Sequence, residues 1–284
     1  MLEIEEVLQG YREDFTVVVV DDGSGEQTQH ALSKFTFKSD TIKYRILRLD
    51  FNIGHQAALE QGILFAHSEG ASHAVIMDGD GEDDPMAIRR MLGMREYDVV
   101  RVVRGRREES WQFRLGYRLY KMLFELITLK KMNFGNYCMI NQKVMKIIAN
   151  NSFIHLAAYL SKLKLKSTSV LSDRRHRHAG KSRMTTVDLI HHAFRSFVEY
   201  AEEMVMVFLR LFAILFILFL ITIGYILYLK FFTTKAILGW TSTLGIGLLT
   251  SALVCIGFFV IGMLLLNFSH GRRRAPVPIY KIVN

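Results

Sequence analysis

A dense group of carboxylates follows one short apolar run in this chain. The run His73–Met77 leads into Asp78-Gly79-Asp80, and Gly81–Pro85 adds three more acidic residues directly after it. Carboxylates at the tip of a buried strand repel one another and lose hydration, and a divalent cation among them relieves both effects. Hard oxygen ligands suit Mg²⁺ or Mn²⁺, and Mg²⁺ is commonly held by one or two carboxylates together with substrate phosphates. The group therefore predicts an enzyme that handles a diphosphate, and a plain acidic turn is the alternative.

A second acidic pair, Asp21-Asp22, ends another apolar run, Phe15–Val20. Strand-like runs alternate with helical patterns through the first hundred residues, which predicts an α/β fold with a doubly wound, mostly parallel sheet. Ligands bind such sheets at the carboxyl ends of the strands, where both acidic groups would lie. Their coincidence on two strands favours a binding site more strongly than either group alone.

The elements that would position these groups follow from periodicity. Residues 1–10 have helical spacing, and a segment over 186–205 is amphipathic, so it would either lie in a membrane interface or pack on the domain. The remaining helices are predicted at residues 28–35, 55–66, 86–94 and 111–129, and the strands at 15–20, 42–49, 73–77, 98–103 and 134–140.

The chain has 284 residues, half of them hydrophobic, and the apolar residues concentrate after Arg210. A membrane-spanning helix needs about 20 mainly apolar residues, and the stretches 207–229 and 237–266 both satisfy this length. Basic residues outside the two spans outnumber those in the short loop between them, which places the large domain and the tail in the cytoplasm. We therefore predict a domain over 1–185, a juxtamembrane helix over 186–205, two spans within 206–270 and a basic tail over 271–284.

The formal net charge is +9. Because no nucleic-acid-binding motif accompanies it, this charge favours an anionic lipid surface over nucleic acid as a partner. Cys138 falls in the cytoplasmic part and Cys255 inside a span, so we do not expect them to form a disulfide.

Three motifs, in order and spacing, resemble those of family 2 glycosyltransferases. They are Val18–Ser24, Asn52–Ala58 and Met77–Pro85, and Val103–Arg107 and Arg175–Met184 fit the same pattern. The chain is most similar to members that act on polyprenyl phosphates and carry two C-terminal spans. This resemblance implies a GT-A-type fold and a membrane-anchored, inverting, metal-dependent glycosyltransferase, in a bacterial inner membrane.

The resemblance also implies roles for single residues on the donor side. Asp78 and Asp80 would be the catalytic pair, holding Mg²⁺ or Mn²⁺ against the diphosphate of a nucleotide sugar. Glu82–Asp84 would aid the metal or the sugar, or be solvated. Arg106 suits a phosphate contact and a surface position equally. The residues implied in donor binding are Asp21, Asp22, Gly54, Asp78 and Arg106.

The acceptor side depends on a basic segment before the spans, which would meet phosphates or attract anionic lipids. Its members are Arg175, Arg177, Lys181, Ser182 and Arg183. A polyprenyl phosphate is anionic at pH 7, so it would attack the sugar without a general base, whereas a hydroxyl acceptor would need one. Transfer to a lipid-linked saccharide and a catalytically inactive membrane scaffold are the alternatives, and a homo-oligomer stays open.

The chain departs from the family pattern at two places. The strand that opens the family pattern is absent, and Met1–Gly10 resembles the helix after it. Because that strand is central, its loss would leave an apolar groove and unpaired backbone, and we interpret the sequence as N-terminally truncated. Phe134-Gly135-Asn136-Tyr137 stands where many relatives have Asp-Phe-Arg, which leaves acceptor recognition open.

Overall fold

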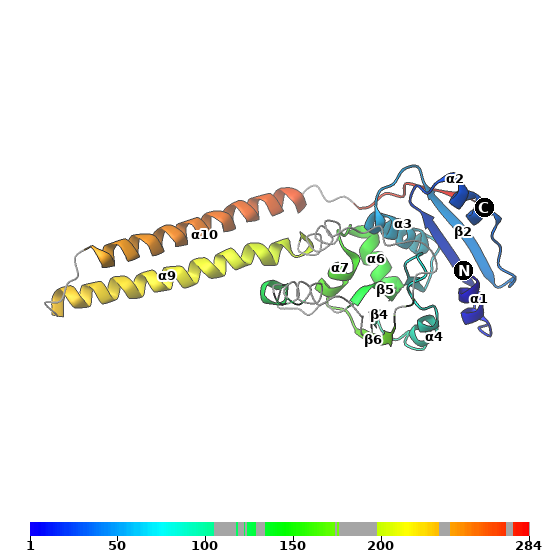
Figure 1. The fold of residues 1–284 in the computed structure, drawn as a ribbon, viewed down its shortest axis with the longest axis horizontal. Coiled ribbons are helices and arrows are strands. Elements are labelled where there is room, and N and C mark those ends of the chain that lie inside the picture. The colour runs from blue at the N-terminus through cyan, green and yellow to red at the C-terminus, as the bar shows by residue number, and fades with distance from the viewer. Residues whose placement is uncertain are drawn as a thin grey trace. The chain divides into compact units, whose positions relative to one another are not determined.

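The computed structural model describes residues 1–104, 118, 122, 124–128, 134–173, 175, 198–232, 239–270 and 275–283 (Figure 1). The chain forms two compact units. The first is an α/β domain made of Met1–Lys121, Lys130–Glu199 and the C-terminal Arg274–Asn284. The second is helical and is made of Met122–Leu129 and Tyr200–Arg273.

The first sheet of the α/β domain has the strand order β1-β2-β7. Strands β1 (Phe15–Asp21) and β2 (Ile42–Leu49) are parallel and are joined through α2 (Glu26–Lys34). Strand β7 (Tyr280–Val283) pairs antiparallel with β2. The sequence predicts only a basic tail over these residues, whereas in the structure Tyr280–Val283 forms an edge strand of the sheet.

The second sheet has the order β3-β5-β4-β6. Strand β5 (Phe134–Asn141) runs antiparallel to both β3 (His73–Ile76) and β4 (Val99–Arg104), and β4 is parallel to β6 (Ser167–Ser172). The prediction of one mostly parallel sheet is therefore wrong, because both sheets are mixed. An apolar run reports that a strand is buried but carries no information about its direction.

The two sheets are separated at β1 and β3. In the described part of the chain, β1 pairs with β2 alone and β3 with β5 alone. Helix α3 (His55–Ser68) packs against both strands, and Gly62 makes room for Val20, whose Cγ2 would lie 3.0 Å from an added Cβ. The apolar run Phe15–Val20 forms most of β1, and its valines are half-buried.

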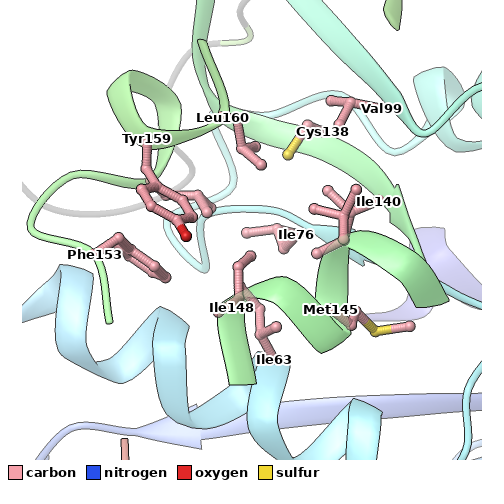
Figure 2. Packing of buried hydrophobic residues seen from close by; sticks show 12 residues of the cluster. Ile63, Ile76, Val99, Cys138, Ile140, Met145, Ile148, Phe153, Tyr159 and Leu160 are labelled. Atoms are coloured by element: carbon pink, nitrogen blue, oxygen red, sulfur yellow. The ribbon is translucent and has the colours of Figure 1, made fainter. Parts of the chain in front are cut away.

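Apolar side chains from both faces of the second sheet form the core of the domain. One cluster joins α3, β3, β4 and β5 to α6 (Gln142–Asn150) and α7 (Leu156–Lys162), as Figure 2 shows. Burial raises the pKa of the Cys138 thiol in this cluster to about 12, so it is a packing group rather than a nucleophile. A second cluster packs α1 (Leu2–Leu8) and α4 (Met86–Leu92) on the other side of the same strands.

Asp98, just before β4, ties the ends of three strands together. Its carboxylate accepts hydrogen bonds from the Lys166 backbone N–H at 2.9 Å, from Asn141 Nδ2 at 3.0 Å and from Lys143 Nζ at 3.3 Å. The Lys166 hydrogen bond contributes most to holding the pKa of Asp98 below its ordinary value of 3.8. The ionised form is therefore favoured by folding, and this contribution is present above pH 3.8 and is lost as pH falls below it.

We expect Asp98→Ala to lower the free energy of unfolding by about 1–3 kcal/mol at pH 7, because three donors lose a mostly buried acceptor. The variant and the wild type should converge as the pH falls below 3.8. Thermal unfolding of the detergent-solubilised protein at a series of pH values measures both effects. The exposed Asp40→Ala is the control, and an equal loss in both variants would contradict the assignment.

The helical unit contains two long apolar helices that pack against each other, α9 (Ala201–Phe232) and α10 (Trp240–His270) (Figure 1). Ala201–Phe232 and Thr243–Phe268 are long and apolar enough to cross a membrane, and most of their apolar side chains are not buried within the protein. They match the two predicted spans. The predicted juxtamembrane helix lies mostly outside the described residues, and its last residues, from Ala201, belong to α9.

Gly262 marks a close approach between α9 and α10. A Cβ at Gly262 would lie 2.6 Å from Val205 Cγ2, and Phe208 and Phe258 pack with ring centroids 5.4 Å apart. Small residues allow such contacts between apolar helices. We expect Gly262→Leu to destabilise the helix pair by about 1–3 kcal/mol. Gly257→Leu is the matched control, because nothing lies within 4 Å of its added Cβ, and similar thermal unfolding of both variants would refute the prediction.

Candidate functional site

The first two motifs meet at the carboxyl ends of β1 and β2. Asp22 Oδ1 accepts a hydrogen bond from the Ile53 backbone N–H at 2.7 Å, and its Oδ2 accepts one from the Gly54 N–H at 3.0 Å. Gly23 has φ +72° and lies against the backbone of Asn52, where an added Cβ would approach within 3.0 Å. The acidic turn therefore holds the loop that leads into α3.

Asp21 stabilises the same turn from inside. Its Oδ1 accepts a hydrogen bond from the Ser24 N–H at 2.9 Å, and its Oδ2 lies 3.8 Å from Arg48 Nε. The Asp21 side chain is 0% exposed. Contact between this carboxylate and a donor would require the turn to open, so a donor-binding role for Asp21 stays a prediction.

The acidic loop after β3 is shaped by its own carboxylates. The buried Asp83 accepts a hydrogen bond from the Asp78 N–H at 3.0 Å, and Asp80 accepts one from the Glu82 N–H at 3.1 Å. Asp84 accepts one from the Met86 N–H at the start of α4, also at 3.1 Å. Asp83 and Asp84 thus stabilise the loop, and an additional contact of either with the metal or the sugar stays a prediction.

His55, which was not among the predicted site residues, adjoins the Asp78 carboxylate, and Asn136 adjoins His55. His55 Nε2 lies 3.5 Å from Asp78 Oδ1 and 3.0 Å from Asn136 Nδ2. These contacts bring together the start of α3, the end of β3 and strand β5. His55 stands inside the second motif and Asn136 inside the segment that departs from the family pattern. Nothing in the sequence indicates that the two would meet at Asp78.

Arg175 connects the predicted acceptor segment to the acidic loop. Its Nη2 lies 2.7 Å from Asp84 Oδ1, its Nη1 lies 2.8 Å from Glu3 Oε2, and its backbone N–H donates to the Glu82 carbonyl at 2.9 Å. The structure thus brings one predicted phosphate-binding residue to the loop. The remaining acceptor residues and one donor residue lie outside the described part of the chain: Arg177, Lys181, Ser182 and Arg183 of the acceptor group, and Arg106 of the donor group.

Tyr137 stabilises the acidic loop after β3, because its hydroxyl donates a hydrogen bond to the Asp84 carbonyl at 2.8 Å. Burial, followed by the nearby Asp83 and Asp84 carboxylates, raises the pKa of Tyr137 well above its ordinary value. The phenol therefore stays protonated and keeps donating this hydrogen bond across the physiological pH range.

Asp78 and Asp80 have the chemistry of a shared Mg²⁺ or Mn²⁺ site. Over the described residues, no three His, Cys, Asp or Glu side chains converge on a complete metal site. Two carboxylates completed by substrate phosphates are nevertheless a common arrangement for Mg²⁺. Asp78 Oδ1 is buried and has no hydrogen-bond partner within the described structure, which leaves this oxygen suited to a cation. The residues therefore fit the metal, and the binding itself stays a prediction.

The α/β domain and its acidic loop suit an enzyme of diphosphate chemistry, and comparison with known proteins identifies the family. Residues 4–159, more than half of the chain, match the family described as glycosyl transferase family 2. The chain belongs to this family.

Two proteins of Bacillus subtilis (strain 168) are similar to it. The uncharacterized glycosyltransferase YkcC is 25% identical over 274 residues, which cover 91% of this chain and 81% of that protein. The uncharacterized glycosyltransferase YkoT is 27% identical over 214 residues, which cover 72% of this chain and 62% of that protein. Neither name specifies a donor or an acceptor.

Proposed function

We propose that this family 2 glycosyltransferase is membrane-anchored and moves a sugar from a nucleotide-sugar donor to a lipid acceptor, a polyprenyl phosphate, with inversion at the anomeric carbon. One observation carries the donor side of the proposal. Asp22 holds the loop before α3, and His55, the first residue of that helix, lies beside Asp78. The His55 side chain of the second motif thereby lies beside a carboxylate that would meet the donor diphosphate.

Each part of the site has a physical role in this reaction. Asp78 and Asp80 would hold a divalent cation, which when bound supplies charge neutralisation for the departing nucleoside diphosphate. Asp83 and Tyr137 keep the carboxylates and the loop in place. Arg175 would hold the basic segment next to the loop through Asp84 and Glu3. Because a phosphate acceptor is already an anion, positioning and charge stabilisation suffice for the transfer.

The two apolar helices support the proposal that the acceptor is a lipid. They would anchor the protein in a membrane, where a polyprenyl phosphate presents its head group at the surface. The excess of basic residues outside the spans favours a cytoplasmic α/β domain. Strand β7 supports this topology, because the chain returns to that domain soon after α10 ends.

Membranes that contain the full-length chain test the proposal. They are incubated with Mg²⁺ or Mn²⁺ and a panel of radiolabelled nucleotide sugars, and the lipids are then extracted. We expect one sugar to enter a lipid fraction and to be released by mild acid, as a glycosyl phosphate is. An acid-stable glycolipid would instead indicate transfer to a hydroxyl of a lipid-linked saccharide. Absence of labelled product from every donor would favour an inactive scaffold.

A further inference from the structure

The C-terminal segment from Val277 to Val283, which ends in strand β7, is held against β2 and α3 by contacts of several kinds. Its backbone pairs with β2 from Leu49 opposite Tyr280 to Ile46 opposite Val283. The rings of Tyr280 and Phe65 of α3 meet edge to face, with centroids 5.8 Å apart. The end of the chain is therefore an integral part of the α/β domain.

Gln61 of α3 provides the most specific of these contacts. Its Nε2 donates to the Val277 carbonyl at 3.2 Å, and its Oε1 accepts from the Ile279 N–H at 2.9 Å. The Gln61 side chain is buried, at 4% exposure, so its amide is satisfied by the C-terminal segment rather than by water. A buried amide without hydrogen-bond partners costs free energy. Gln61 therefore favours an extended backbone segment beside α3, because that segment offers both a carbonyl and an N–H.

Strand β7 contacts both β2 and α3. The same two elements flank the loop whose backbone N–H groups donate to Asp22. Strand β2 ends at Leu49 and α3 begins at His55, and Ile53 and Gly54 between them donate to Asp22. Lys281 of β7 pairs with Asp50, the first residue of this loop, at 2.7 Å.

We propose that β7 is a positioning element for this loop: by fastening β2 to α3, it holds Ile53, Gly54 and His55 in the arrangement that receives the donor. This deepens the proposed function, on which its catalytic consequence rests. The strand would then act on donor affinity, through the loop, more than on the turnover of bound donor.

The test uses Ile279→Pro in the full-length chain. This change deletes the N–H that donates to Gln61 Oε1, and it replaces an apolar side chain that is 44% exposed. Ile279→Val is the matched control, because it keeps the N–H. Gln61→Met is the second variant, because it removes the same contacts from the α3 side with a side chain of similar size.

Hydrogen exchange at Ile53 and Gly54 is the first readout, and it requires no substrate. We expect both test variants to exchange there about tenfold faster than the wild type while the buried strand β5 is unaffected. Ile279→Val should match the wild type. Unchanged exchange of the loop in both test variants, or an equal rise in every element, would overturn the proposal.

The second readout is binding of a panel of nucleoside diphosphates with Mn²⁺, measured by calorimetry. We expect the two test variants to bind the preferred nucleotide about tenfold more weakly than Ile279→Val does. If the wild type binds no nucleotide, the proposed function fails, and the exchange measurement still decides whether β7 positions the loop. Equal affinities together with a loosened loop would refute the effect on donor binding.

Discussion

Asp80→Asn is expected to lower the rate of sugar transfer by about 10²–10³-fold, the magnitude typical of losing a group that stabilises charge in a transition state. An amide of the same shape cannot supply the negative charge that a divalent cation requires. Asparagine keeps an oxygen that can accept the Glu82 N–H, so the loop should stay folded. Initial rates of transfer to extracted lipid, measured at several Mn²⁺ concentrations, give the effect.

Glu69→Gln is the control, because it neutralises an exposed carboxylate at the far end of α3 and should leave the rate unchanged. Asp83→Asn provides a contrast, since Asp83 holds the Asp78 N–H and its loss should lower thermal stability together with activity. Turnover of Asp80→Asn within about threefold of the wild type would remove the metal assignment, because a metal ligand is worth far more.

The second large effect is expected for Asp22→Ala, which should raise the KM for the nucleotide sugar by about ten- to a hundredfold. Both oxygens of Asp22 hold backbone N–H groups, and a hydrogen bond to a charged group contributes about 1.5–3 kcal/mol. Without them the loop before His55 loses its fixed position, so the expected change is in donor affinity. Steady-state kinetics with varied donor concentration measure it.

Asp22→Asn should be intermediate, because its amide keeps one acceptor oxygen and turns a donor toward the second N–H. Asp14→Ala is the control, because Asp14 is 78% exposed and forms a solvent-exposed ion pair at 3.8 Å. A donor KM equal to that of the wild type in Asp22→Ala would show that the loop does not depend on this carboxylate.

The positions of the elements were largely predictable, because periodicity of apolar residues reports which segments are buried. The segments predicted over 15–20, 42–49, 73–77, 98–103 and 134–140 are β1 to β5, and the helix predicted over 55–66 is α3. The two apolar helices were also predicted. Their length and apolar composition, which suffice to cross a membrane, can be read from the sequence without knowledge of the fold.

Roles within the acidic loop were not predictable at the same level. The loop contains four aspartates, which the sequence alone does not distinguish. In the structure, Asp83 is buried and accepts a hydrogen bond from a backbone N–H, whereas Asp84 forms an ion pair with Arg175. His55 reaches Asp78 from a different motif. These differences arise from contacts between distant residues, and no local pattern encodes them.

The local order of residues was therefore enough to locate strands, helices, spans and acidic strand ends, since each depends on neighbours a few positions apart. Strand direction, the division into two mixed sheets and the return of Tyr280–Val283 to β2 depended on pairing between distant segments. A short apolar segment such as β7 pairs with whichever strand edge the folded domain leaves open. Its partner is therefore set by packing in three dimensions and not by its own composition.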